Sequence, residues 1–180
     1  MMINGNMVIP GNSDEPLNDE EKALILSTGI TALKITAGGS QGTYEETLEE
    51  LASYAKVFEN NPDVFMKINS IADIETAYAT RRVGIILGFE ASTMHESKTD
   101  RIAEFAGRGV RVMQLSYNVA SPFGTGVMVT EGQKGLTELG REAIGIMETN
   151  GVLLDLSHSD RETTLEAIKV STHAPAITHA

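Results

Sequence analysis

The chain has 180 residues, of which 41% are hydrophobic, and this is enough apolar material for a single domain over residues 1–180. The formal net charge is −11, and 14 basic residues are scattered among 25 acidic ones. A nucleic-acid partner is therefore not expected, because proteins that bind phosphates need clustered Lys and Arg. The absence of cysteine excludes disulfides and thiolate chemistry, so a metal would have to be held by imidazole and carboxylate groups.

Features that would direct the chain to a membrane are missing from the sequence. No apolar run approaches membrane-spanning length, and the N-terminus lacks the basic-then-apolar order of a signal peptide. We therefore expect a soluble cytoplasmic protein with no membrane partner.

The first half of the chain alternates short apolar runs with amphipathic stretches. The runs predict strands at Met7–Ile9, Ile30–Thr36, Phe65–Ile68 and Val83–Phe89. Helices are predicted over Leu17–Thr28, from a capping Thr43 to Phe58, and over Ser70–Arg81. The strand at 83–89 is apolar throughout, as strands buried on both faces are, and it ends on Glu90. A carboxylate there needs a partner, for which Arg81 and Arg111 are candidates.

The second half continues this alternation. A helix is predicted over Asp100–Gly107, a strand over Val110–Ser116, and a further helix with an apolar face between Leu136 and Met147. The segment Val119–Gly135 has no periodicity and is predicted to be a long loop, a kind of segment usually kept for function. Tyr117 and Asn118 precede this loop. They are candidates for contact with a substrate, with capping of the loop as the alternative.

Two short apolar runs near the end of the chain, Val152–Leu156 and Ala174–Ile177, are each followed by a polar cluster that contains a histidine, His158 and His179. The runs predict two strands joined by a helix, and such a unit closes as a right-handed crossover with parallel strands. Both histidines are then expected at the carboxyl edge of the sheet, where ligands of α/β proteins collect.

The helix between these two strands has its own signals. Ser159 lies three residues before Glu162, which is the spacing of a capping box. Leu165 and Ile168 are predicted to form its apolar stripe.

Three candidate ligands, Glu90, His158 and His179, thus follow three different strands. Two imidazoles and a carboxylate form a sound ligand set for zinc and leave a position for a water molecule. Each residue alone has a structural alternative, since a histidine at a strand end is more often simply hydrogen-bonded.

Three other polar residues leave their roles open or favour a structural one. Asp155 could point into the sheet interior or anchor a backbone amide. His95 and His173 lie in polar, loop-like surroundings and are expected to be solvated.

The succession of β–α units of about thirty residues predicts an α/β fold with a parallel sheet. About six strands are predicted, whereas an eight-stranded barrel typically takes ~250 residues. The alternatives are an open sheet or an incomplete (β/α)8 TIM barrel. We favour the incomplete barrel, because no glycine-rich phosphate fingerprint follows the first strand. The unpaired edges of such a barrel would invite pairing with another copy, so the isolated chain is expected to associate or to be poorly soluble.

Several segments resemble the membrane (renal) dipeptidase family of zinc metallopeptidases, in particular its bacterial branch. These are GIILGFEAS at 84–92, GVRVMQLSYN at 109–118, the stretch 135–168 that contains DLSH, and PAITHA at 175–180, together about half the chain. The resemblance implies a (β/α)8 barrel of the metal-dependent hydrolase type, hydrolysis of dipeptides, and two zinc ions bridged by a glutamate. It makes Glu90 that bridging, catalytic carboxylate and makes His158 and His179 ligands of one zinc. Tyr117 falls where better-known members place a substrate-contacting histidine.

The sequence departs from the family pattern at both ends. Active members carry a His-x-Asp pair on the first strand, which holds the other zinc, whereas INGNMVIP here has neither residue. One zinc site is thus expected, with the second lost or incomplete. A substrate-binding arginine and a late aspartate would follow Ala180, so the chain resembles the first two-thirds of the family domain.

The leading hypothesis is therefore a zinc-dependent dipeptidase-like metallohydrolase. The alternative is a non-catalytic barrel relative that binds a metal or a small molecule, which the missing His-x-Asp pair favours. A third hypothesis is a phosphate-binding barrel enzyme without a metal.

Overall fold

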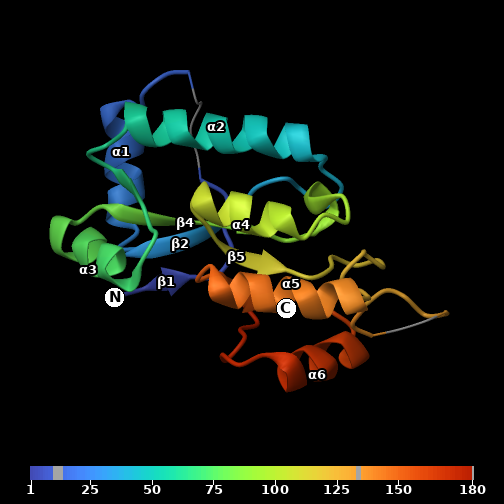
Figure 1. The fold of residues 1–180 in the computed structure, drawn as a ribbon. Helices are drawn as coiled ribbons and strands as arrows, with labels where there is room; N and C mark the ends of the chain where they lie inside the picture. The colour runs from blue at the N-terminus through green and yellow to red at the C-terminus, as the bar shows by residue number, and fades with distance from the viewer. Residues whose placement is uncertain (10–13, 133–134, 180) are drawn as a thin grey trace.

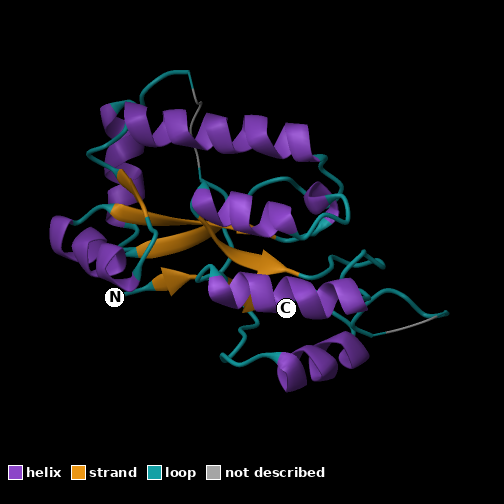
Figure 2. Ribbon diagram, in the orientation of Figure 1, coloured by secondary structure: helices purple, strands orange, loops and turns teal. Residues whose placement is uncertain are grey.

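The computed structural model describes residues 1–9, 14–132 and 135–179. Its centre is a sheet of parallel strands, with helices on both sides of it in the view of Figure 1 and Figure 2. The strands are β1 (Ile3–Asn4), β2 (Ala32–Thr36), β3 (Phe65–Lys67), β4 (Val83–Phe89), β5 (Val110–Gln114) and β6 (Leu153–Asp155). The order is β1-β2-β4-β5-β6, and β3 also pairs with β4. Because β2 occupies one edge of β4, β3 and β5 share the other edge, β3 at its start and β5 at its end.

The helices follow the strands and begin at side-chain caps in most cases. They are α1 (Asp19–Ser27), α2 (Tyr44–Asn60), α3 (Ile71–Thr80), α4 (Asp100–Gly107), α5 (Glu138–Thr149) and α6 (Arg161–Val170), with a short 3-10 turn, η1 (Thr93–His95). Asn18, Thr43 and Ser70 each form a complete capping box, which fixes where α1, α2 and α3 start. Figure 1 shows the sheet between α2 above and α5 and α6 below.

The apolar core lies between the helices and one face of the sheet. Alternate residues of a strand point to opposite faces. In β2, Leu33 and Ile35 belong to the core cluster, and the residues between and after them, Lys34 and Thr36, face the other way. The same alternation in β4 sends Phe89 into the core and the next residue, Glu90, to the face that carries Lys34.

The sheet curls so that its first and last segments approach each other. Gly5, just after β1, lies so close to the C-terminal segment that a Cβ atom there would be 2.5 Å from the carbonyl oxygen of Thr178. Only a glycine allows this approach of two backbones. The carboxyl ends of β1, β2, β4 and β6 are thereby brought to one region of the molecule.

Most of the predicted elements are confirmed, and two of the strand predictions need correction. The strand predicted at Met7–Ile9 is wrong, because β1 is Ile3–Asn4 and the later run forms no strand. Of this run only Ile9 is buried in the core, whereas Met7 and Val8 are exposed. The run Ala174–Ile177 is parallel as predicted, but it makes only a single bridge, between Ala176 and Asp155.

The start and the stripe predicted for α6 are also wrong. The N-cap is Asp160, whose side chain accepts a hydrogen bond from the Thr163 N–H. Leu165 and Ile168 are 41% and 49% exposed, because α6 buries the small side chains of Thr163 and Ala167 instead.

Candidate metal centre

Glu90, His158 and His179 come together at the carboxyl edge of the sheet. Glu90 follows β4 directly, His158 lies just after β6, and His179 ends the segment that pairs with Asp155. One ligand atom from each side chain lies within 4.8 Å of the other two. The two imidazole Nε2 atoms are 2.9 Å apart, and His179 Nε2 lies 4.0 Å from Glu90 Oε1.

The hydrogen bonds of the two imidazoles fix which nitrogens face each other. His158 Nδ1 lies 2.9 Å from Asn118 Oδ1, which can only accept, so this nitrogen carries the proton. The Thr178 hydroxyl donates to Asp155 Oδ2 and therefore accepts from His179 Nδ1, at 3.0 Å. In the neutral rings both Nε2 lone pairs then face each other. Two lone pairs at 2.9 Å repel unless a cation or a proton lies between them, so this donor set fits a metal ion.

The backbone at His158 is held in an uncommon conformation. Its φ is +64°, in the left-handed region, where a residue with a side chain is strained unless its surroundings hold it. The His158 carbonyl accepts from the Val127 N–H at 2.8 Å, and the Ser159 N–H donates to the Leu156 carbonyl. Val127 thus supports the turn that presents His158; it lies in the predicted loop Val119–Gly135, of which residues 133–134 are outside the described residues.

Asp155 anchors both histidine-bearing segments. Its Oδ1 accepts from the Ser157 N–H and hydroxyl and from the Thr178 N–H, and its Oδ2 accepts from the Thr178 hydroxyl and from Gln114. Burial raises the pKa of Asp155, but these hydrogen bonds outweigh burial and keep its pKa below the usual value. Asp155 therefore fits both predicted alternatives, because it lies on the face of the sheet that carries Lys34 and also anchors backbone amides.

Glu90 is paired with Lys34, a residue that the sequence reasoning missed. The ammonium lies 3.5 Å from Glu90 Oε1, and the Thr36 hydroxyl lies 2.8 Å from the same oxygen. Arg81 and Arg111, the predicted partners, do not make this contact; Arg111 instead donates to backbone carbonyls, among them that of Ala106. Lys34 is the one charged residue in the predicted strand ITALKIT, and this pattern could have indicated a buried lysine that needs an acidic partner.

For both Glu90 and Lys34, burial and the neighbouring groups shift the pKa in opposite directions. Burial raises the pKa of Glu90, but the Thr36 hydrogen bond, Lys34 and Asn6 together hold it below its ordinary value. Burial lowers the pKa of Lys34, and the nearby Glu90 and Asp155 charges counteract part of that shift. Burial also lowers the pKa of His158, with a further contribution from His179.

Tyr117 and Asn118 lie against His158. The Tyr117 ring centroid is 4.2 Å from that of His158, and Asn118 holds His158 Nδ1. A pocket of about 350 Å³ adjoins the two histidines and is otherwise lined by Val127, Leu156, Ser157, Ser159, Thr164 and Ile177. Its position suits a small molecule that would reach the imidazoles.

The other two histidines lie away from this centre. His173 is exposed, as predicted. His95 is buried, contrary to prediction, and packs against Phe89, Phe105 and Phe123. The apparent loop around it is the buried η1 turn, which a polar local sequence does not reveal.

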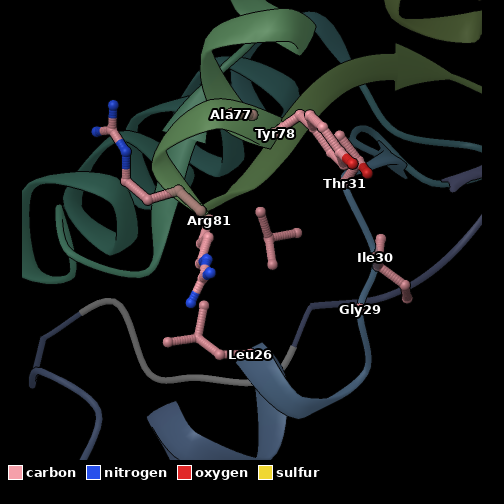
Figure 3. A pocket seen from close by; sticks show the side chains of 9 residues that line it. Leu26, Gly29, Ile30, Thr31, Ala77, Tyr78 and Arg81 are labelled. Carbon is pink, nitrogen blue, oxygen red and sulfur yellow. The ribbon is translucent and has the colours of Figure 1, made fainter. Parts of the chain in front are cut away.

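A separate pocket of about 220 Å³ lies near the amino ends of β2 and β4 (Figure 3). Figure 3 shows Leu26, Ile30 and Arg81 around it. None of its lining residues carries an imidazole or a carboxylate. It therefore offers none of the ligand chemistry found at the opposite edge of the sheet.

Comparison with known proteins decides which family this arrangement represents. Residues 25–180 match the membrane dipeptidase family, peptidase family M19. The chain belongs to this family. The resemblance drawn from the motifs is thereby confirmed, and the family is one of metal-dependent peptidases.

Individual relatives of this dipeptidase-family chain agree with that assignment. A Schizosaccharomyces pombe protein described as an uncharacterized dipeptidase is 31% identical over 99 residues, which are 53% of this chain and 24% of that protein. An amidohydrolase of Pseudomonas aeruginosa superposes with a TM-score of 0.88 at 27% identity, over 99% of this chain and 52% of its own. A metallopeptidase of Rhodobacter sphaeroides, solved with a phosphinate mimic of the dipeptide L-Ala-D-Ala, has a TM-score of 0.70 at 20% identity, over 82% of this chain and 42% of its own.

These matches also settle the fold class. The parallel sheet forms part of a (β/α) barrel, as predicted, and not an open sheet. The chain spans about half the length of the amidohydrolase, and its matched segment of 99 residues covers about a quarter of the S. pombe protein. Among the residues that the structure describes, no helix is long and apolar enough to cross a membrane.

Proposed function

We propose that this chain carries the zinc site of a dipeptidase, in which Glu90, His158 and His179 hold the metal. The observation that supports the proposal most directly is the pair of imidazole Nε2 atoms 2.9 Å apart, each on a ring whose Nδ1 is already hydrogen-bonded. Zinc prefers such neutral imidazoles together with a carboxylate. When bound, the ion would polarise a peptide carbonyl and lower the pKa of a coordinated water to about 7.

The residues of the chain have distinct parts in this proposal. Asn118 and Thr178 hold the two imidazoles in the tautomer that directs Nε2 inward. Glu90 supplies negative charge, and its depressed pKa keeps it ionised at neutral pH. Tyr117 and Asn118 lie against His158, which lines the adjoining pocket, and they are the candidate contacts for the part of a dipeptide that extends beyond it.

The activity can be tested with L-Ala-D-Ala, the dipeptide whose mimic is bound by the R. sphaeroides metallopeptidase. The purified chain with added zinc should release free alanine, and chelation should stop the reaction. His179→Ala should lower the rate by at least about 100-fold, because it removes a ligand. His173→Ala is the matched control and should leave the rate unchanged, since His173 is exposed and lies outside the group formed by Glu90, His158 and His179.

Two results would contradict the proposal in different ways. A folded chain that binds no zinc would remove its basis. Zinc binding without hydrolysis of any simple dipeptide would instead favour the non-catalytic relative.

A further inference from the structure

Lys34 is a deeply buried basic side chain near the proposed metal centre. Its side chain is 2% exposed, whereas that of Glu90 is 17% exposed. A buried ammonium is costly to keep unless a nearby negative charge compensates it. The compensating groups here are Glu90 and Asp155, whose charges also act on His158.

The packing around Lys34 directs its ammonium towards Glu90. Gly88 lies beside it on β4, and a Cβ atom at Gly88 would be 2.7 Å from Lys34 Cε and 3.2 Å from Lys34 Cγ. The absence of a side chain at Gly88 therefore leaves the space that the lysine stem fills. At the end of the stem, Nζ lies 3.3 Å from Thr36 Oγ1 and 3.5 Å from Glu90 Oε1.

The side of Glu90 that faces β1 and β2 has few groups that could bind a metal. Its neighbours there are the Lys34 ammonium, the Thr36 hydroxyl and the Asn6 amide. An ammonium repels a divalent ion, and neutral hydroxyl and amide groups do not supply the negative charge that would offset this repulsion. The histidine side of Glu90, in contrast, offers two imidazoles.

We propose that Lys34 is a built-in cation that takes the place of a second metal ion beside Glu90, so that the centre binds one divalent ion. This inference rests on the proposed zinc site. Lys34 and that ion share the Glu90 carboxylate, and each offsets part of its charge. The lysine thus limits both the number of ions bound and the affinity for the single ion.

The test is a zinc titration of the full 180-residue chain by calorimetry, with elemental analysis of the dialysed protein. Wild type should bind one zinc ion per chain. Lys34→Met removes the competing charge and should tighten zinc binding by about tenfold, given the strength of one unit charge at short range. Lys34→Arg retains the charge and should bind zinc as wild type does. Lys67→Met, a lysine on β3 that contacts the Arg108 carbonyl, is the control outside the site.

Folding of each variant is checked by circular dichroism, and Lys34→Gln carries the same expectation should Lys34→Met fail to fold. Two zinc ions bound to wild type would overturn the proposal. Unchanged or weaker zinc binding by a folded Lys34→Met or Lys34→Gln chain would overturn it as well, while leaving the zinc site itself intact. A wild-type chain that binds no zinc would overturn both this inference and the proposed function.

Discussion

At the scale of single residues, the proposed centre is assembled from side chains that lie far apart in the sequence. Glu90, His158 and His179 were recognised as strand-end residues, and the structure brings them together. Asn118 was a candidate for substrate contact, and the structure places it on His158. Lys34 could not be assigned, because the contact that explains it joins two strands 56 residues apart in sequence.

Asn118 gives a test of how the His158 ring is held. Asn118→Ala removes the acceptor of the Nδ1 proton, so the ring would lose its fixed tautomer and orientation. Loss of such a partner typically weakens metal affinity by about 10–100-fold. Zinc titration should show this loss, whereas Asn118→Asp retains an acceptor oxygen and should stay close to wild type. Equal zinc affinity in Asn118→Ala and wild type would show that this hydrogen bond does not position the ligand.

At the scale of elements, local signals predicted most helices and strands well. The ranges predicted for β4 and α4 match the structure, because an uninterrupted apolar run and a clear amphipathic turn leave little choice. One error arose where two adjacent residues could perform the same task. Ser159 and Asp160 both suit an N-cap, and the structure uses Asp160.

The choice of cap can be tested by two neighbouring substitutions. Asp160→Ala should lower the free energy of unfolding by about 1 kcal/mol, because its carboxylate accepts from the Thr163 N–H at 2.7 Å. Ser159→Ala should change it by less than about 0.5 kcal/mol, since the buried Ser159 hydroxyl has no hydrogen-bond partner among the described residues. Urea unfolding of both variants measures the difference. The reverse order of effects would restore the capping box predicted from the sequence.

At the scale of the whole molecule, alternating units predicted the parallel α/β sheet but not its detailed order. The pairing of β4 with β2, and the approach of Gly5 to Thr178, depend on how the sheet curls. No local pattern encodes that curvature. Association of the isolated chain stays a prediction, and the exposed side chains of Ile3 in β1 and Leu153 in β6 are where it would begin.

The stability of the whole chain should depend on pH through His95. Burial lowers the pKa of His95 from 6.5 to about 4, while the Ser92 carbonyl raises it and Arg101 lowers it further. Above pH 6.5 the ring is neutral in both states and contributes nothing. As the pH falls towards 4, only the unfolded chain takes up the proton, so this group should destabilise the fold by about 2–3 kcal/mol.

A His95→Phe variant isolates this contribution. The Ser92 carbonyl still accepts from the backbone N–H of residue 95, so the substitution leaves no buried group unpaired there. Unfolding measured between pH 7 and pH 4 should be less pH-dependent in this variant than in wild type. Parallel pH profiles for wild type and His95→Phe would show that the folded chain does not lower the pKa of His95.

The central claim is that Glu90, His158 and His179 hold one metal ion. The most direct measurement is the zinc content per chain, determined by elemental analysis after dialysis, for wild type, His158→Ala and His173→Ala. We predict about one zinc ion in wild type and in His173→Ala, and almost none in His158→Ala, because three ligands are needed for a stable protein zinc site. Equal zinc content in all three proteins would place the metal elsewhere and contradict the proposed centre.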